Sequence, residues 1–276
     1  MTKLLVNEMF ASIAGEGVYA GTPNFFIRLV GCNLYCSWKG IMGASMCDSI
    51  YASHPTNGSE IKYKTVDEVY TAFSELMKQY PRIRQLTITG GEPLLQKTGI
   101  IEFLKLIPRD MEVSFETNGT QYPIDKETLN EVLPIDLWTV SPKLSSSCYF
   151  ENSMTIPQAL QEKHRKERIN IRVLYEFIIR AKVTKCIFKF VVADEKDIEE
   201  VKGIIEDIKK YAQGVDPSSL PCIEHFLSRM VYIMPCGETE EKLQKSRLLC
   251  VEACKNNGWN YTDRLQIIIY GDKRGV

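Results

Sequence analysis

The sequence predicts an α/β fold, an open or partial parallel β/α barrel of about six strands with helices outside. Short apolar runs typical of buried strands alternate with longer segments of helical spacing. About five or six such repeats are too few for a closed eight-unit barrel. Distinctive short motifs also follow several of the expected strands. We expect residues 1–276 to form one domain, with an insertion at 39–46 and an extra helical segment at about 145–180.

The composition narrows the class of protein. Hydrophobic residues make up 44% and charged residues 25%, which is ordinary for a globular domain. The net charge of −1 gives no electrostatic reason to expect binding to nucleic acid or to an anionic membrane. No apolar run is long enough to span a bilayer, and Glu8 comes too early for a signal peptide. We expect a cytoplasmic protein.

The first third of the chain shows two strands and a helix. Lys3–Phe10 reads as a strand, and a tight glycine-rich turn follows at Ser12–Gly17. Phe25–Val30 is a strongly apolar strand, and Ser53–Tyr63 reads as a surface loop. A helix begins at Thr65, where Thr65 and Glu68 have the spacing of a capping box.

The remaining elements alternate along the chain. Four strands are expected at Gln85–Thr89, Glu112–Phe115, Asp136–Val140 and Lys185–Val192, followed by two at Arg229–Met234 and Leu265–Tyr270. Helices are expected at Lys97–Leu106, Lys126–Val132, Ile156–Ile179, Glu195–Tyr211 and Glu238–Cys254. This alternation is typical of a parallel sheet with helices outside.

Three cysteines in one loop are the strongest chemical signal. Cys32 and Cys36 are separated by three residues, and Cys47 follows after ten. Three thiolates can hold three corners of a [4Fe–4S] cube and leave the fourth iron without a protein ligand. This stretch resembles the cluster loop of radical S-adenosylmethionine enzymes, whose cysteines are usually separated by three and then two residues. The resemblance implies that residues 39–46 are an insertion between the second and third ligands, because their removal restores that spacing.

The other cysteines have a simpler interpretation. Nine cysteines cannot all pair in disulfides, and in a reducing compartment they are ligands or small buried hydrophobes. Packing is favoured for Cys148, Cys186 and Cys222, and for Cys250 and Cys254 on one helix face. A second metal site formed by Cys222, Cys236, Cys250 and Cys254 stays open as an alternative.

Short polar motifs follow the predicted strands, and in parallel folds this is where chemistry occurs. They are Gly31-Cys32, Thr89-Gly90-Gly91-Glu92-Pro93, Glu116-Thr117-Asn118-Gly119-Thr120, Ser141-Pro142-Lys143 and Met234-Pro235-Cys236-Gly237. Glycines there let strand-end carbonyls accept hydrogen bonds from an ammonium. A carboxylate or hydroxyl can bind ribose hydroxyls, and a lysine can bind a carboxylate. Together these motifs indicate one binding site along a single rim of the sheet.

Three of the charged candidates have structural alternatives. Arg28 is the only charge in its strand, and it either points outward or holds a carboxylate inside the barrel. Glu116 could instead be a helix N-cap partner, and Lys143 a solvated surface charge.

These motifs resemble the radical S-adenosylmethionine (SAM) superfamily. Within it, the stretches that narrow the resemblance look like the 7-carboxy-7-deazaguanine synthase family: residues 7–10, 15–17, 21–23, 26–29, 31–34, 47–49, 116–119 and 141–143. The resemblance is dense over residues 4–143. It implies ring contraction of 6-carboxy-5,6,7,8-tetrahydropterin to 7-carboxy-7-deazaguanine with loss of ammonia, on the route to queuosine-type deazapurines. A reduced cluster would cleave SAM to a 5′-deoxyadenosyl radical that abstracts a substrate hydrogen and later takes it back.

The resemblance also implies roles for individual residues. Cys32, Cys36 and Cys47 would hold the cluster, with Asp48 beside it. Contacts to SAM would come from Gly90, Gly91, Glu116, Ser141, Pro142 and Lys143. The substrate site would be lined by Ile13, Ala14, Gly15, Glu16, Arg28, Thr89 and the chain terminus, Val276. Ala14 stands where many members have glutamine, and Tyr270 could replace a histidine often seen near the C-terminus.

Further partners follow from the same resemblance. The family uses Mg²⁺ held by a hydroxyl two residues after the last cluster cysteine, which is Ser49 here. An electron donor such as flavodoxin or ferredoxin is expected, and so is a homodimer, in which the 145–180 segment is either a dimer element or a lid.

Two other functions fit parts of the sequence. An activase that installs a glycyl radical on a partner enzyme would share the cluster loop but would not need Gly15–Gly17 and Arg28. A non-catalytic iron–sulfur or metal-binding protein would use four ligands rather than three.

Overall fold

A computed structural model describes residues 1–38, 47–56, 58–123, 135–150, 156–180, 185–271 and 273–275. Three of the expectations above lie outside these residues. They are the insertion at 39–46, the helix at Lys126–Val132 and the substrate contact of Val276.

A single nine-stranded sheet organises the described chain, in the order β3-β1-β2-β4-β5-β6-β7-β8-β9. The strands are β1 Lys3–Ile13, β2 Pro23–Leu29, β3 Tyr63–Thr65, β4 Gln85–Gly90, β5 Glu112–Thr117, β6 Ile135–Val140, β7 Lys185–Val192, β8 Val231–Pro235 and β9 Asn260–Tyr261. From β2 to β9 every neighbouring pair is parallel, whereas β1 pairs antiparallel with β2 and β3. The predicted open parallel α/β fold is confirmed, and the sheet is not a closed barrel.

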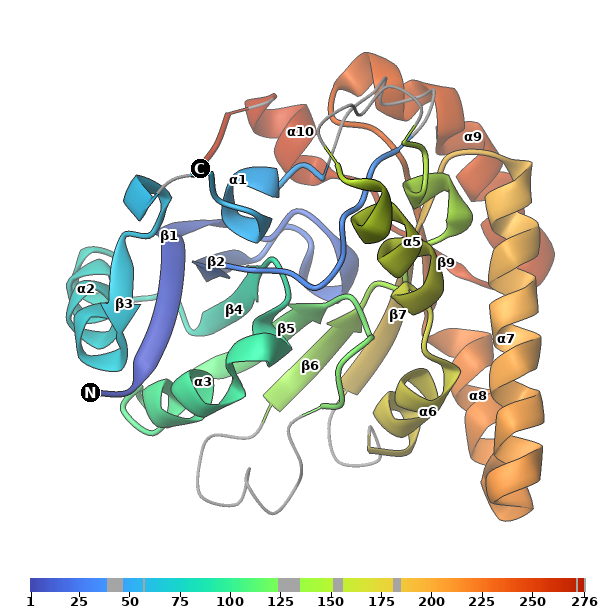
Figure 1. Ribbon diagram of the computed structural model, residues 1–276, viewed down its shortest axis with the longest axis horizontal. Coiled ribbons are helices and arrows are strands. Elements are labelled where there is room, and N and C mark those ends of the chain that lie inside the picture. Colours follow the sequence, from blue (N-terminus) through green and yellow to red (C-terminus); the bar gives the residue numbers. More distant parts are fainter. Residues whose placement is uncertain are drawn as a thin grey trace.

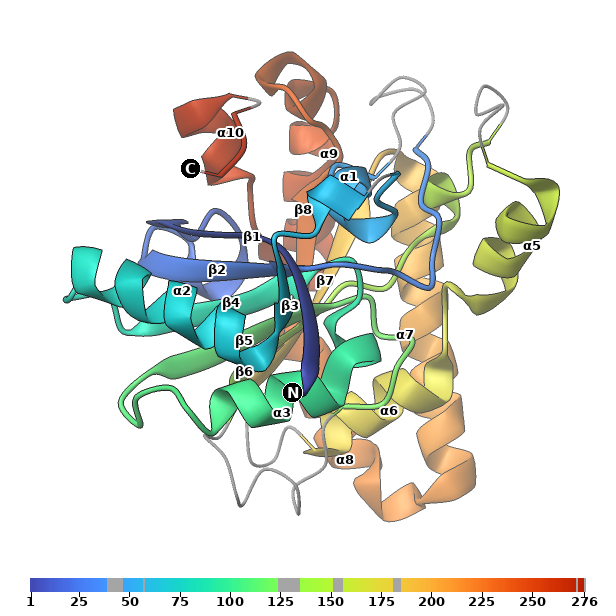
Figure 2. The same ribbon diagram turned by 60° about the vertical axis from the view of Figure 1, so that its left-hand side comes forward.

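Helices cover the outer face and the rim of this sheet (Figures 1 and 2). They are α1 Ile50–Ser53, α2 Val66–Gln79, α3 Lys97–Leu104, α5 Gln158–Glu167, α6 Ile171–Arg180, α7 Glu195–Val215, α8 Leu220–Arg229, α9 Glu240–Asn257 and α10 Leu265–Tyr270. Short 3₁₀ turns lie at η1 Gly17–Tyr19, η3 Gly58–Glu60, η4 Pro93–Gln96, η5 Ser145–Ser147 and η6 Pro217–Ser219. In Figure 1 α1, α5 and α10 lie around the carboxyl ends of the strands.

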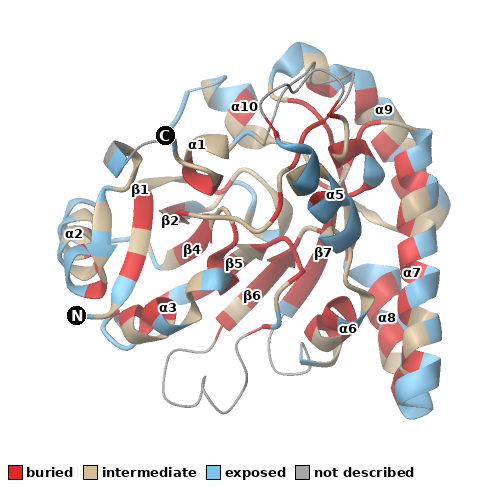
Figure 3. Ribbon diagram, viewed as in Figure 1, coloured by how far each residue is buried: buried red, intermediate tan, exposed pale blue. Residues whose placement is uncertain are grey.

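The core lies between the sheet and its outer helices, where Figure 3 shows the buried residues concentrated. Because side chains alternate along a strand, every second residue of β2, β4, β5 and β7 joins this core, and so does β6 after a register shift that follows Ile135. Phe25, Phe115 and Phe188 are examples, each with no exposed surface. The intervening residues point to the opposite, inner face of the sheet.

The predicted capping box at the start of α2 is present. The backbone N–H of Glu68 donates to the Thr65 hydroxyl, and the Glu68 carboxylate accepts from the backbone N–H of Thr65. Two donors at the helix start are thereby satisfied, which fixes where α2 begins.

The prediction of a last strand at Leu265–Tyr270 is wrong, because this segment forms α10. The run of β-branched residues suggested a strand, but only Ile267 is buried, whereas Ile268 and Ile269 are about half exposed. The strand that pairs with β8 is instead the short β9, just before it in the chain.

Two further segments differ from expectation. The single helix predicted at Ile156–Ile179 is two helices, α5 and α6, because the Asn170 side chain accepts from the backbone N–H of Val173 and starts a new helix. Helix α8, which was not predicted, begins after a turn that contains Pro217. Within Ser53–Tyr63, expected as a loop, η3 is a single 3₁₀ turn, and Tyr63 already belongs to β3.

A search of the described residues finds no helix with the length and apolar character needed to cross a bilayer.

Candidate active site

A cavity of about 800 Å³ opens on the inner face of the sheet. The strand residues that line it alternate with the core residues of the outer face. They are Asn24, Phe26 and Arg28 of β2, Thr87 and Thr89 of β4, Ser114 and Glu116 of β5, Leu137 and Thr139 of β6, and Lys189 and Val191 of β7. The same strands therefore present an apolar surface to the helices and a mostly polar surface to the cavity.

The segment that carries the three cysteines, here called the cluster loop or cysteine loop, is described at residues 31–38 and 47–49. Its residues Cys32, Cys36 and Cys47 all line the cavity. The backbone N–H of Cys47 donates to the carbonyl of Cys36 at 3.0 Å, which places the two residues beside each other although ten residues separate them. A small apolar cluster surrounds the thiols, made of Leu34, Trp38, Val191, Ala193 and Cys236.

This arrangement fits an iron–sulfur cluster. Burial raises the pKa of Cys32 to about 11 and also raises the pKa values of Cys36 and Cys47. Ligand binding must therefore displace protons, as metal binding to thiols generally does. No three His, Cys, Asp or Glu side chains of the described residues are arranged to hold one metal ion. A cube distributes its thiolates over separate irons, so three spaced thiols on an apolar wall suit it.

Of the remaining cysteines, Cys236 lies in the apolar cluster beside the thiols, whereas Cys250 and Cys254 lie apart from it. Cys250 and Cys254 are buried in the main core, and the Cys254 thiol donates to the carbonyl of Asn260 at 3.2 Å. This arrangement favours packing for Cys250 and Cys254 over a second metal site.

Two glycines bring β4 against the start of the cysteine loop. A Cβ on Gly90 would lie 2.3 Å from the Leu29 carbonyl oxygen, and a Cβ on Gly91 would lie 2.0 Å from that of Gly31. Gly90 also has a φ of +133°, which side chains disfavour. The two glycines therefore allow the close approach of two strand ends, in addition to any contact they make with a ligand.

Buried Glu92 then joins this turn to the next strand end. Its carboxylate accepts from the Thr117 hydroxyl at 2.8 Å and from the backbone N–H of Asn118 at 2.7 Å. The Asn118 amide in turn donates to Asn33 in the cysteine loop at 3.0 Å. Glu92 therefore connects the end of β4 directly to the end of β5, and through Asn118 it connects both to the cysteine loop.

Beyond this carboxylate, polar side chains of β4, β5 and the 141–143 loop face the cavity. Glu116 accepts from the Thr89 hydroxyl at 2.6 Å, and Lys143 donates to the Ser141 hydroxyl at 3.0 Å. Glu116 caps none of the helices in the described part of the chain, and Lys143 lines the cavity, so neither residue has the structural role that was its alternative.

Arg28 enters the cavity from β2, so it does not point outward. Its Nε donates to Glu8 at 2.7 Å, and the Tyr51 hydroxyl donates to the same carboxylate oxygen at 2.9 Å. Burial would lower the pKa of Arg28, but Tyr51, Glu8 and Asp48 raise it, so the side chain is a cation. The chain terminus approaches this group, since Arg274 lies over the Tyr51 ring at 4.2 Å.

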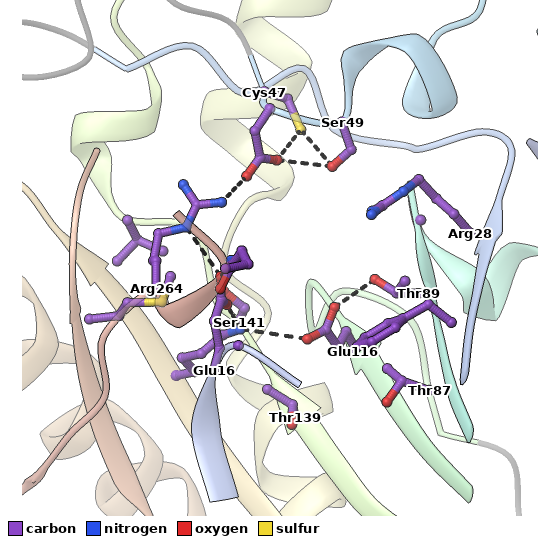
Figure 4. A pocket seen from close by; sticks show the side chains of 18 of the residues that line it. Glu16, Arg28, Cys47, Ser49, Thr87, Thr89, Glu116, Thr139, Ser141 and Arg264 are labelled. Atoms are coloured by element: carbon purple, nitrogen blue, oxygen red, sulfur yellow. Dashed lines mark hydrogen bonds and ion pairs between the residues drawn. The ribbon is translucent and has the colours of Figure 1, made fainter. Parts of the chain in front are cut away.

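Glu16 is the centre of a charge network on the other side of the cavity (Figure 4). Its carboxylate accepts from Lys189, from Nε of Arg264 at 3.1 Å and from the amide of Gln266 at 2.6 Å. Burial alone would raise the pKa of Glu16, but the charges of Lys189 and Arg264 outweigh it and lower the pKa to about 2. Glu16 is therefore ionised at any physiological pH.

Lys189 and Arg264 connect this network to both ends of the site. The Lys189 ammonium also lies 3.8 Å from the Glu116 carboxylate, on the strand that follows β4. Arg264 donates to Asp48 at 2.6 Å, directly beside Cys47, and Asp48 accepts from Ser49 at 2.9 Å. Figure 4 shows Arg264 between the cysteine loop and Glu16.

The structure brings nearly all the residues expected from the sequence to this one cavity. Pro142 is the exception among the described residues, because it is buried and does not line the cavity. Tyr270, suggested as a replacement for a histidine, also does not line it, whereas Gln266 of the same helix does. The sequence analysis missed Lys189, Arg264 and Gln266 as site residues.

Comparison with known proteins adds independent information. A family described as a 4Fe-4S single cluster domain matches residues 13–149. A 7-carboxy-7-deazaguanine synthase of Halobacterium salinarum is 30% identical over 98% of this chain and 91% of its own length. The synthase of Rhodopirellula baltica is 29% identical over 100% of this chain and 90% of its own. In fold, the chain is similar to the crystal structure of QueE from Escherichia coli, with a TM-score of 0.52, 21% identity and coverage of 95% and 94%.

Proposed function

We propose a role for each part of the cavity from one premise, namely that this chain belongs to the 7-carboxy-7-deazaguanine synthase family. The protein is accordingly a radical SAM lyase with a [4Fe–4S] cluster, and it converts 6-carboxy-5,6,7,8-tetrahydropterin to 7-carboxy-7-deazaguanine with release of ammonia. When bound, the reduced cluster and SAM supply the radical chemistry that abstracts and returns a hydrogen atom. The residues of this chain bind, orient and shield the reactants.

Cys32, Cys36 and Cys47 would hold the cluster. The support is that all three thiols line one end of the cavity within an apolar cluster. A low-polarity shell with little solvent access protects a cluster and tunes its potential. Arg264 pairs with Asp48, the residue next to Cys47, and this ion pair would fix the orientation of the third ligand.

The rim formed by β4, β5 and the 141–143 loop would bind SAM. Carbonyls near Gly90 and Gly91 would accept from its ammonium, Lys143 would meet its carboxylate, and Glu116 with Ser141 would bind its ribose hydroxyls. Support comes from their common position on the cavity wall next to the thiols. Pro142 would act only by shaping this loop.

The opposite part of the cavity would bind the pterin. Arg28 suits its carboxylate, because the outer nitrogens of the guanidinium are not engaged by Glu8. Glu16 suits the donor edge of its guanidine-like ring, because it is ionised and accepts hydrogen bonds only. Ile13, Ala14, Gly15 and Thr89 would line the same space, and Val276 would be a further substrate contact.

Ser49 would contribute to binding Mg²⁺. Its hydroxyl and the Asp48 carboxylate, 2.9 Å apart, are the hard oxygen ligands this ion prefers. A Ser49→Ala variant is expected to need a higher Mg²⁺ concentration for half-maximal turnover while retaining its cluster. Unchanged Mg²⁺ dependence would remove Ser49 from the site.

The remaining assignments concern the whole protein. It would act in the cytoplasm as a homodimer reduced by flavodoxin or ferredoxin, and residues 1–276 would form one radical SAM domain with the 39–46 insertion and the extra segment at about 145–180. All nine cysteines are free, which suits a reducing compartment.

The observation that carries the pterin assignment is the ionised Glu16 held in the same cavity as three thiols. Anaerobically reconstituted protein with SAM, dithionite, Mg²⁺ and carboxytetrahydropterin should form carboxydeazaguanine. SAM cleavage without that product would reject the substrate but keep the radical SAM class. Hydrogen abstraction from a large protein partner instead would favour a glycyl radical activase.

A further inference from the structure

We propose that His164 of α5, Arg168 immediately after that helix and Glu200 of α7 form a clamp that positions the SAM-binding loop and steadies the cluster loop. The clamp acts on residues 141–149, which connect β6 to the rest of the rim. This proposal rests on the proposed function, since it takes Ser141 and Lys143 as SAM contacts. The extra segment at about 145–180 would thus have a role, namely to position residues 141–149.

The first half of the clamp is an ion pair that holds the loop backbone at two points. Arg168 and Glu200 lie 2.6 Å apart and are each about one-fifth exposed. The same Arg168 nitrogen donates to the carbonyl of Lys143 at 2.9 Å. The other Glu200 oxygen accepts from the backbone N–H of Ser145 at 2.7 Å. Charged groups make stronger hydrogen bonds than neutral ones, so the loop is fixed on both sides of Leu144.

The second half of the clamp is a buried histidine. His164 has no exposed surface, and its Nε2 lies 3.0 Å from the Ser147 hydroxyl. That hydroxyl already donates to the carbonyl of Leu144 at 2.6 Å, so it accepts from Nε2–H. Burial and the charge of Arg168 lower the pKa of His164 to about 4, which keeps the ring neutral.

The clamped turn in turn pairs with the cluster loop. The Ser147 carbonyl accepts from the backbone N–H of Ser37 at 2.8 Å, and the Ser37 carbonyl accepts from Tyr149 N–H at 2.9 Å. Ser37 follows Cys36, whose carbonyl accepts from Cys47 N–H at 3.0 Å. An unbroken series of contacts therefore runs from α5 through η5 to two of the three thiol-bearing residues.

These contacts lie on one side of the site only. Lys143, the side chain that the clamp positions, faces the SAM rim, whereas Arg28 reaches the pterin region from β2. Loss of the clamp should therefore raise the KM for SAM and leave the KM for the pterin nearly unchanged. Loss of overall stability would change both.

The test uses the reconstituted holoenzyme with Arg168→Met, Glu200→Gln, both together, and Ser147→Ala. Lys166→Met is the matched control, because Lys166 is an exposed cation on the same helix as His164. SAM affinity is measured from the change that SAM causes in the electron paramagnetic resonance spectrum of the reduced cluster. Cluster loss is measured as decay of absorbance under a chelator, and steady-state kinetics give the two KM values.

Arg168→Met and Glu200→Gln should each weaken SAM binding about 10-fold, and the double variant should be no worse than Arg168→Met, because the two residues act as one unit. Ser147→Ala should mainly speed cluster loss, and the pterin KM should stay within about 2-fold throughout. Arg168→Lys, which keeps the charge, should restore part of the SAM affinity and decides the case if Arg168→Met does not fold.

Equal SAM affinity in the wild type and in folded, cluster-loaded Arg168→Met or Glu200→Gln would overturn the proposal. A pterin KM that rises as much as the SAM KM would also overturn it. Failure of the proposed function looks different, because the wild type itself would then bind no SAM or would not turn over the pterin.

Discussion

The two faces of the parallel sheet differ in character although the same strands supply both. Phe188 of β7 points outward, has no exposed surface and packs against Phe226 of α8 with ring centroids 5.1 Å apart. The next residue, Lys189, points inward to Glu16 and Glu116. Neighbouring residues of one strand thus belong to two surfaces, one that packs in the core and stabilises the fold and one that lines the cavity. Substitutions on the two faces should therefore affect different measurements.

The largest effect is expected at the cluster loop on the inner side. Cys47→Ala should abolish turnover and SAM cleavage, since one ligand of three is removed. The apoprotein should still fold, with nearly the same thermal midpoint, because Cys47 lies outside the main core. Iron content and SAM cleavage, measured after anaerobic reconstitution, decide the matter. If both remained normal, the long-gap ligand assignment would fail.

The next largest effect is expected on the outer face. Phe188→Ala should lower the free energy of unfolding by about 3–5 kcal/mol, because it removes a fully buried ring and leaves a cavity. Below its melting temperature the variant should keep its KM for the pterin. Lys189→Met, at the neighbouring residue, should change the KM values and also cost stability, because it leaves buried Glu16 without one of its cationic partners. A Phe188→Ala enzyme of normal stability but altered KM would contradict this division between the faces.

A third prediction concerns pH and the charge network. The folded pKa of Glu16 is about 2, against an ordinary value of 4.5, so its contribution to stability is present above about pH 4.5 and is lost as the pH falls toward 2. Glu16→Gln should therefore destabilise the apoprotein at pH 7, by on the order of 3 kcal/mol. Urea unfolding at a series of pH values should show this difference shrinking in acid. A difference independent of pH would mean that the Glu16 charge does not stabilise the fold.

The smallest effect is expected at the start of α2, where Thr65 does not line the cavity. Thr65→Ala removes the capping box of α2 and should cost about 1 kcal/mol of stability. Turnover per folded enzyme should not change. A loss of activity greater than the loss of folded protein would show that α2 influences the cavity.

The sequence predicted the fold and much of the rim, for identifiable physical reasons. Apolar strands between helices imply a parallel sheet, and loops at strand ends must then meet at one edge. Arg28 could be proposed because it is a lone charge in an apolar strand. Lys189 carries the same signal, as the only charge within residues 186–192, and that signal was not used.

Some site residues and one helix could not be predicted from the local sequence pattern. Arg264 and Gln266 reach Glu16 across about 250 residues of sequence, and no short-range signal marks such a contact. The error at α10 had the same origin, because β-branched residues favour strands while tertiary contacts decide. The α5–α6 break is different, because it depends on one local hydrogen bond to Asn170, a residue type that favours helix starts, and that signal was not used.

Lys189 has one further consequence for how the enzyme would operate. Its single ammonium is shared between Glu16, which we propose binds the pterin, and Glu116, which we propose binds SAM. A ligand that draws either carboxylate away changes the charge felt by the other, so occupancy of one half would alter affinity in the other half. Thermodynamic reciprocity requires the two factors to be equal. Such cooperativity would let the enzyme postpone cofactor cleavage until both compounds are in place, and so limit wasteful consumption of SAM.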